Sequence, residues 1–331
     1  MKFGVLQFFS WPGKRVPLDE VYRRALERVR IMDQTGYDCV WLAEHHFSTY
    51  SVCPSVHMMG MHIAGMTKNL RIGTGVSLAA MYHPLRLAEE VALLDVLSEG
   101  RVNWGAGRGF DATEFQVFGI EQADSQAKFH ENVQIVLKAW KNETFTHHGK
   151  YYDFDNIEVL PKPFQSPHPP VWMAASSMGS VTWAAEQGFA ILMDPHSGHA
   201  DIGLKFDHYV KTLAASGHGE PKQSTPMARL LAVDPNPRKA EAIARAGAEW
   251  TVGSYAGKAK ASLSAKPTPD ADGGDPIERY MADTIIYGTP DAVVDKLHEL
   301  QETISLDYLL CNPLSHSTFT EFTESVLPKF T

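Results

Sequence analysis

The stretch at residues 83–109, HPLRLAEEVALLDVLSEGRVNWGAGRG, carries the signals of a helix, a buried strand and a glycine-rich turn in direct succession. Pro84 suits the first turn of a helix, where its missing N–H has no partner to lose. Apolar residues then recur at helical spacing as far as Leu97, and Gly100 ends the helix. A short strand follows at 101–104, so the stretch predicts one helix–strand unit of an α/β fold.

The same alternation of helices and short apolar strands extends over nearly the whole chain. Eight strands are predicted, at 2–8, 39–43, 70–78, 101–104, 171–175, 190–193, 227–233 and 306–311. Such alternation is typical of either an open doubly wound sheet or a (β/α)8 barrel. Eight strands in 331 residues favour the α/β class with a single (β/α)8 TIM-barrel domain over 1–331.

Two segments interrupt this rhythm. Residues 144–168 combine aromatic residues with a proline-rich exit, which predicts an inserted hairpin. Residues 251–276 are rich in Ala, Ser, Gly, Lys and Pro and show no hydrophobic periodicity. A segment of this kind is either a disordered surface loop or a lid, because long irregular loops inside compact domains are often functional. We expect a lid loop near 251–283.

The balance of charge argues against two classes of partner. The chain has 30 basic and 39 acidic residues and a formal net charge of −9, so it is a poor candidate for binding nucleic acid or an anionic membrane surface.

Its three cysteines are too few and too irregularly spaced for a disulfide framework or a zinc site. The N-terminus lacks a signal-peptide pattern and no apolar run reaches membrane-spanning length, so we expect a cytoplasmic protein.

The glycine-rich run Gly105–Gly109 follows the strand at 101–104 directly and contains Arg108. Glycines allow a backbone to approach a ligand closely, and an arginine at the C-terminal end of a strand suits a phosphate. The alternative is a tight turn with a solvent-facing arginine. The spacing does not match the dinucleotide-binding G-x-G-x-x-G pattern.

Several sequence blocks resemble those of one family and occur in the same order along nearly the whole chain. Besides the stretch at 83–109, they are GYDCVWLAEHHF at 36–47, IGTGV at 72–76, VFG at 117–119, PPVWMAASS at 169–177, TWAAEQG at 182–188 and YGTPDAV at 287–293. On these blocks the chain resembles the bacterial luciferase-like, flavin-dependent monooxygenase superfamily. The resemblance implies a barrel fold and a homodimer.

The chemistry that the resemblance implies is oxygenation by a flavin. Reduced FMN, supplied by a separate flavin reductase, reacts with O2 to give a flavin 4a-peroxide, which oxygenates a small organic substrate such as an aldehyde or ketone. The cofactor carries this chemistry, and the protein orients it and excludes water. No nicotinamide-binding fingerprint is present in the sequence, in keeping with a partner reductase.

His45, directly after the second predicted strand, matches the family's catalytic histidine. Chemistry in a parallel barrel lies at the C-terminal ends of the strands, and an imidazole there can transfer protons near neutral pH. A metal site is the weaker interpretation, because no H-E-x-x-H or Cys/His pattern is present. Gly75 and Val76 end the third strand, where the resemblance implies a non-prolyl cis peptide behind the flavin ring; packing of the strand around a small residue is the alternative.

The phosphate of FMN is expected between two strand ends. The resemblance pairs Arg108 with it, and the fifth strand ends in Ala175, Ser176 and Ser177, with Ser180 at the start of a helix. Hydroxyl groups and amides at a helix N-terminus bind phosphate well, and they also serve simple capping of the helix. Ser176 stands where bacterial luciferase has an acidic residue and Gly107 where it has a cysteine, which argues against light emission but not against flavin binding.

The substrate pocket is expected to have apolar walls. Its predicted residues are Phe8, Trp11, Phe110 and Met193, each of which has barrel core as its alternative. His196 and His199 belong either to the pocket or to an exposed loop. The predicted helices at 56–67 and 83–97 carry more apolar surface than packing on a barrel requires, which predicts a subunit interface.

Two other functions remain open for this sequence. One is hydride transfer with a deazaflavin on the same fold, and the other is a non-catalytic flavin-binding paralogue. Retention of His45 and Arg108 argues against the second.

Overall fold

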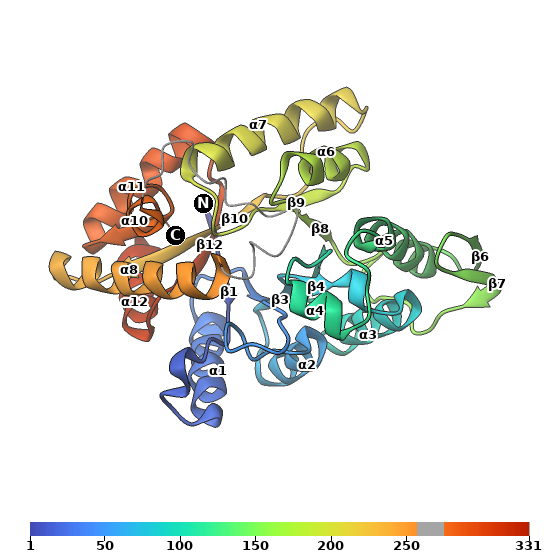
Figure 1. Cartoon of the computed structure of the whole chain (residues 1–331), viewed down its shortest axis with the longest axis horizontal. Helices are drawn as coiled ribbons and strands as arrows, with labels where there is room; N and C mark the ends of the chain where they lie inside the picture. The colour runs from blue at the N-terminus through green and yellow to red at the C-terminus, as the bar shows by residue number, and fades with distance from the viewer. Residues whose placement is uncertain (257–274, 331) are drawn as a thin grey trace.

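The computed structural model describes residues 1–256 and 275–330. Parallel strands form a curled central sheet with helices around its outside (Figure 1). The strands are β1 (Lys2–Gln7), β2 (Cys39–Leu42), β3 (Arg71–Thr74), β4 (Ser77–Leu78), β5 (Val102–Gly107), β6 (Thr144–His148), β7 (Asp153–Glu158), β8 (Val171–Ala174), β9 (Ala190–Leu192), β10 (Pro226–Val233), β11 (Ile285–Gly288) and β12 (Tyr308–Pro313). The α-helices are α1 (Leu18–Gln34), α2 (Val56–Met66), α3 (Pro84–Leu97), α4 (Ala112–Val117), α5 (Ser125–Lys141), α6 (Met178–Glu186), α7 (His199–Ala215), α8 (Pro237–Thr251), α10 (Pro276–Asp283), α11 (Pro290–Ile304) and α12 (His316–Glu321).

Eight of the strands close into a barrel in the order β1-β2-β3-β5-β8-β9-β10-β12. Parallel ladders join neighbouring strands, and β12 pairs with β1 to continue the circle. The contact between β9 and β10 is short: the amide of Met193 donates to the carbonyl oxygen of Pro226, and the amide of Ala228 donates to that of Met193. The predicted α/β barrel is therefore confirmed.

Burial explains why the barrel strands read as largely apolar runs, with Asn103 in β5 and Arg229 in β10 as exceptions. Every residue of β2, β5 and β10 is buried, because one face packs on the helices and the other fills the barrel. Inside the barrel, Trp41 and Trp172 pack edge to face with ring centroids 5.2 Å apart. These two side chains, with smaller neighbours, fill the interior beneath the C-terminal ends of the strands.

Two of the predicted strands have different bounds in the structure. The cis peptide Gly75–Val76 divides the strand predicted at 70–78 into β3 and β4. The strand predicted at 101–104 continues through the glycines to Gly107. A Cβ atom on Gly105 would lie 2.0 Å from the carbonyl oxygen of Thr74, so only glycine lets the two strands approach this closely.

The hairpin predicted within 144–168 is confirmed: β6 and β7 pair antiparallel and project from the body beyond α5 (Figure 1). The prediction of a lid loop over 251–283 was wrong at its C-terminal end, where helix α10 forms. Asp275 caps this helix, because its side chain accepts a hydrogen bond from the amide of Ile277. The N-terminal end of the predicted loop is also helical, because α8 ends at Thr251 and a π-helix covers Val252–Ala256. The rest of that prediction, at 257–274, lies outside the described residues. Helix α4 and strand β11 were also missed.

Candidate active site

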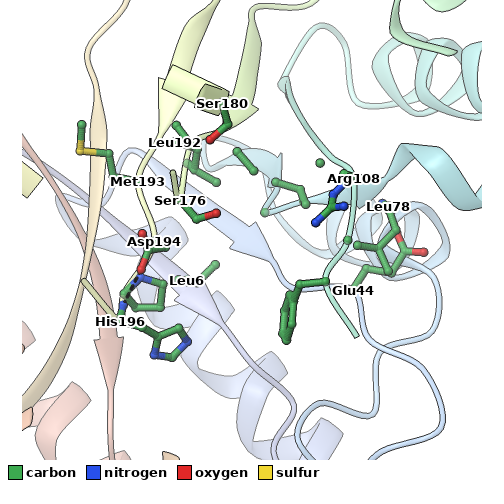
Figure 2. Close-up of a pocket in the computed structure, with 18 of the residues that line it drawn as sticks. Leu6, Glu44, Leu78, Arg108, Ser176, Ser180, Leu192, Met193, Asp194 and His196 are labelled. Atoms are coloured by element: carbon green, nitrogen blue, oxygen red, sulfur yellow. Dashed lines mark hydrogen bonds between the residues drawn. The ribbon is translucent and has the colours of Figure 1, made fainter. Parts of the chain in front are cut away.

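A cavity opens at the C-terminal ends of the barrel strands and brings together nearly all of the predicted site residues. Its lining includes Phe8, His45, Gly75, Val76, Gly107, Arg108, Phe110, Ala175, Ser176, Ser177, Ser180 and Met193. Figure 2 shows Arg108 across the cavity from Ser176 and Ser180, whereas Asp194 and His196 lie on the side opposite Glu44 and Leu78. The cavity thus has two ends of different chemistry.

Arg108 supplies the positive charge at the first end. Its Nη1 donates to Ser125 Oγ over 3.2 Å, and its guanidinium lies 5.8 Å from the ring centroid of Phe115. Burial lowers the pKa of Arg108, but an arginine remains a cation at neutral pH. A cation held in a partly buried position favours an anionic ligand group.

The N-terminus of α6 faces the same end. Ser177 and Ser180 form a capping box, in which Ser177 Oγ accepts from the amide of Ser180 and Ser180 Oγ accepts from the amide of Ser177. Capping leaves the amides of Met178 and Gly179 without an acceptor among the described residues. Capping and anion binding are therefore compatible here, because different donors serve each.

Gly75, Val76 and Gly107 form another part of the lining. The cis peptide Gly75–Val76 that the resemblance implied is present and lies on the lining. Val76 packs so closely on Gly107 that a Cβ there would lie 2.4 Å from Val76 Cγ2. Glycine at 107 therefore keeps this part of the lining shallow enough for a planar ring to lie against it.

His45 lies at the second end and is held by a buried carboxylate. Its Nδ1 is 3.3 Å from Oε1 of Glu114, which is 0% exposed and also accepts the amide of His46 over 2.8 Å. A carboxylate can only accept here, so the proton of the neutral imidazole lies on Nδ1 and Nε2 is left to exchange a proton with a ligand. Around the imidazole, Phe8 stacks on it and Phe110 packs edge to face.

His46 has a different environment from His45. Its Nε2 lies 3.1 Å from Oε1 of Glu44, which also accepts from the hydroxyl of Tyr82, while Oε2 accepts from the amide of Leu78. Glu44 lines the cavity and ties three elements together. Its role was missed, although its position beside the two histidines was visible in the sequence.

A second buried network supports the turn at Gly75–Val76. His57 on α2 contacts Ser77 Oγ through Nε2 and Glu90 on α3 through Nδ1, both over 3.0 Å. Ser77 opens β4 directly after the cis peptide, so the network joins that turn to two outer helices. Hydrogen bonds from His57 and Arg86 outweigh burial and lower the pKa of Glu90 to about 2 from 4.5.

This pKa shift predicts a defined loss of stability in acid. Because the pKa of Glu90 is depressed in the folded state, its contribution is present above about pH 4.5 and is lost as pH falls toward 2. Glu90→Gln should lower the free energy of unfolding at neutral pH by about 2 kcal/mol, less than the full shift because the carboxylate is partly exposed.

Denaturant unfolding from neutral pH to about pH 3 measures this effect, and the difference from wild type should shrink across that range. Glu89→Gln, on the same helical turn, is the control and should change stability by less than about 0.5 kcal/mol. A constant difference at every pH would contradict the assignment.

Sequence reasoning missed Tyr50 and Asp194, which the structure brings together with His196 at the second end. All three line the cavity. Tyr50 packs edge to face on His45 with ring centroids 4.9 Å apart, and its hydroxyl lies 3.3 Å from Nε2 of His196. For His196, the structure therefore decides in favour of the pocket over an exposed loop. A tyrosine in a loop between β2 and α2 carries no local signal of this role.

Two candidates lie elsewhere. Trp11 is not among the described residues that line the cavity; its Nε1 donates to the carbonyl oxygen of Val16. His199 is buried at the first position of α7, where its amide donates to Asp283.

Over residues 1–256 and 275–330, no group of three His, Cys, Asp or Glu side chains is placed to hold a metal ion. In the same ranges no helix has the length and apolarity to cross a membrane.

A parallel barrel whose strand ends surround a cavity lined by an arginine, the N-terminus of a helix and a histidine held by a carboxylate has the layout of a barrel enzyme. The chain belongs to the luciferase-like monooxygenase family, whose sequence profile matches residues 1–306. It is 29% identical to the oxygenase component of the flavin-dependent trigonelline monooxygenase of Acinetobacter baylyi, over 63% of this chain and 59% of that protein. The matched region spans 54–64% of the first curated relatives.

Solved structures share the fold over almost the full chain. The oxygenating constituent of 3,6-diketocamphane monooxygenase from Pseudomonas putida, in complex with FMN, has a TM-score of 0.83 at 20% identity and covers 100% of this chain and 99% of that one. An F420-dependent secondary alcohol dehydrogenase has a TM-score of 0.78 at 18% identity, covering 98% and 97%. At these identities the likeness concerns the fold alone.

Proposed function

We propose that the chain is the oxygenase component of an FMN-dependent monooxygenase that takes reduced FMN from a separate flavin reductase and uses O2 to oxygenate a small organic substrate such as an aldehyde or ketone. The observation that carries this proposal is one cavity with an anion-binding end, a glycine-containing part of the lining and a histidine-containing end. The name of the trigonelline relative supports a two-component system.

The lining fits FMN on chemical grounds. Arg108 and the first amides of α6 are the donor set that a phosphate requires, with Ser176 beside them. The wall of Gly75, Val76 and Gly107 matches a planar ring system. Reduced FMN, when bound, supplies the reaction with O2.

The chain's own residues would orient the reactants and move protons. His45 Nε2 is the group placed to take or give a proton, and Glu114 holds the imidazole in the required tautomer through Nδ1. Phe8 and Phe110 flank the imidazole and limit the access of water to it. These roles require no metal ion.

Removing the phosphate-binding charge tests the proposal. Arg108→Ala should weaken FMN binding by about 1.5–3 kcal/mol, the scale of a hydrogen bond to a charged group. Riboflavin has no phosphate, so its affinity should hardly change. Quenching of flavin fluorescence measures both ligands. Equal losses for FMN and riboflavin would refute the phosphate assignment.

Binding affinities for reduced FMN and for the reduced deazaflavin F420 distinguish the proposed cofactor from the alternative. F420-dependent enzymes share this barrel, so the fold does not choose between the cofactors. Mixing the protein with reduced FMN or reduced F420 should give the tighter complex with FMN under our proposal. Oxygen uptake beyond that of free reduced FMN, in a screen of substrates, would distinguish an oxygenase from a non-catalytic flavin-binding paralogue.

We also propose that α2 and α3 form a homodimer interface. Met58 is 77% exposed, and Leu93 and Leu97 are 46% and 55% exposed on α3. An apolar surface of this kind is typical of a subunit contact. Sedimentation at micromolar concentration should show a dimer that Met58→Glu and Leu97→Glu together dissociate; a wild-type monomer under these conditions would contradict the proposal.

A further inference from the structure

A hydrogen-bonded chain of two phenols and one imidazole crosses the second end of the cavity. Nε2 of His196 lies 3.3 Å from the hydroxyl of Tyr50, and Nδ1 lies 3.2 Å from the hydroxyl of Tyr280 on α10. Both distances are at the long end for hydrogen bonds, so each contact is weak. Tyr50 and His196 line the cavity, whereas Tyr280 is not among its described lining residues.

The loop that carries His196 is held in place on both sides. Oδ1 of Asp194 accepts the amides of His196 and Ser197 over 2.9 and 2.8 Å. Arg229, fully buried on β10, donates to the carbonyl oxygens of Ser197 and Asp194 from behind. The imidazole is therefore positioned before a ligand arrives, which lowers the entropic cost of binding.

At this end of the cavity the lining carries the carboxylate of Asp194, and the carboxylate of Glu114 lies behind His45. Lys205, with its Nζ 3.9 Å from Oδ2 of Asp194, and Arg229 lie beside this carboxylate, but neither is among the described residues that line the cavity. Burial alone would raise the pKa of Asp194, but Lys205, the backbone amide of His196 and Arg229 outweigh it and hold the pKa below its usual value, so the group is an anion. Burial and Arg229 lower the pKa of His196, which is therefore neutral at pH 7.

We propose that Tyr50 and His196 bind the oxygen of a neutral substrate, and that Asp194 excludes substrates carrying a carboxylate. A neutral imidazole and a phenol each donate and accept, so together they suit a carbonyl or hydroxyl oxygen. Arg108, the cation on the lining, lies toward the other end and cannot balance a substrate carboxylate here. This inference rests on the proposed oxygenase function.

Three probes that share a phenyl ring test the binding of a neutral oxygen and the exclusion of a carboxylate separately. Ethylbenzene has neither group, acetophenone has a carbonyl and benzoate has a carboxylate. Their affinities for the FMN-loaded protein are measured by ligand-observed NMR. Acetophenone should bind most tightly and benzoate most weakly. Tyr50→Phe and His196→Phe should each weaken acetophenone about tenfold, the value of one hydrogen bond, and leave ethylbenzene unchanged. Tyr280→Phe is the matched control, because it removes a hydroxyl from the same imidazole outside the lining, and acetophenone affinity should stay near wild type.

Asp194→Asn keeps the side-chain shape and removes the charge, so it should strengthen benzoate at least about tenfold relative to acetophenone. Thermal denaturation and FMN affinity in each sample report whether the fold and the proposed function hold. Benzoate binding as tight as acetophenone, acetophenone affinity unaffected by Tyr50→Phe and His196→Phe, or no saturable acetophenone binding up to its solubility limit would each overturn the inference. Failure to bind FMN would instead count against the proposed function.

Discussion

Replacing His45 by alanine is expected to reduce coupled oxygenation by about 10²–10⁴-fold, the usual contribution of a positioned acid or base. The fold and FMN affinity should remain nearly intact, because the imidazole packs against Tyr50, which contacts His196 at the second end of the cavity. Oxygen consumption should continue, with hydrogen peroxide as its product. The measurement is the ratio of oxygenated product to hydrogen peroxide, with a substrate found by the oxygen-uptake screen.

His46→Ala is the control for this experiment. His46 contacts Glu44 and the ring of Phe118, so its loss should reduce thermal stability and leave the coupling ratio largely unchanged. A His45→Ala protein with wild-type coupling would refute the catalytic role. Joint loss of thermal stability and flavin binding, with coupling preserved in the folded fraction, would show that His45 is structural.

Replacing Arg229 by methionine is expected to lower the free energy of unfolding by about 3–5 kcal/mol, the scale for breaking a buried charge pair. The guanidinium is fully buried, and its loss would leave the carbonyl oxygens of Asp194 and Ser197 without their donors. It would also remove a positive charge near the partly exposed carboxylate of Asp194. Denaturant unfolding measures the change.

Arg245→Met is the matched control, since Arg245 is an exposed arginine on α8 paired with Glu278 at 2.7 Å. Exposed pairs contribute little, so the change should be below about 1 kcal/mol. Equal effects of the two substitutions would show that Arg229 does not stabilise the loop after β9. Because that loop carries His196, Arg229→Met should also weaken acetophenone binding in the molecules that remain folded.

Much of the fold follows from local sequence patterns. Parallel barrel strands are buried on both faces, so β2 reads as a continuous apolar run and β10 as a run interrupted only at Arg229, and both can be predicted without knowledge of their neighbours. The segments that were missed have weaker local signals. Strand β11 has only four residues, and α10 follows a segment without hydrophobic periodicity.

The residues of the candidate site also divide into those that local sequence patterns predict and those that they do not. Arg108, the serines after β8 and His45 follow strand ends directly, and the ends of parallel strands meet at one edge of a barrel. Trp11 shows the limit of this reasoning: it lies four positions beyond β1, but its Nε1 donates to the carbonyl oxygen of Val16 and it is not among the described residues that line the cavity.

The sequence by itself determined the barrel, its family and the residues at the strand ends, because each depends on contacts within a short stretch of chain. Only the tertiary structure decided which distant groups complete the site. Glu114 meets His45 across 69 positions, and Tyr280 meets His196 across 84. The burial of Arg229 likewise appears only once β10 lies behind the loop at 194–197. These contacts depend on barrel closure, and no periodicity along the chain encodes which side chains that closure brings within hydrogen-bonding distance.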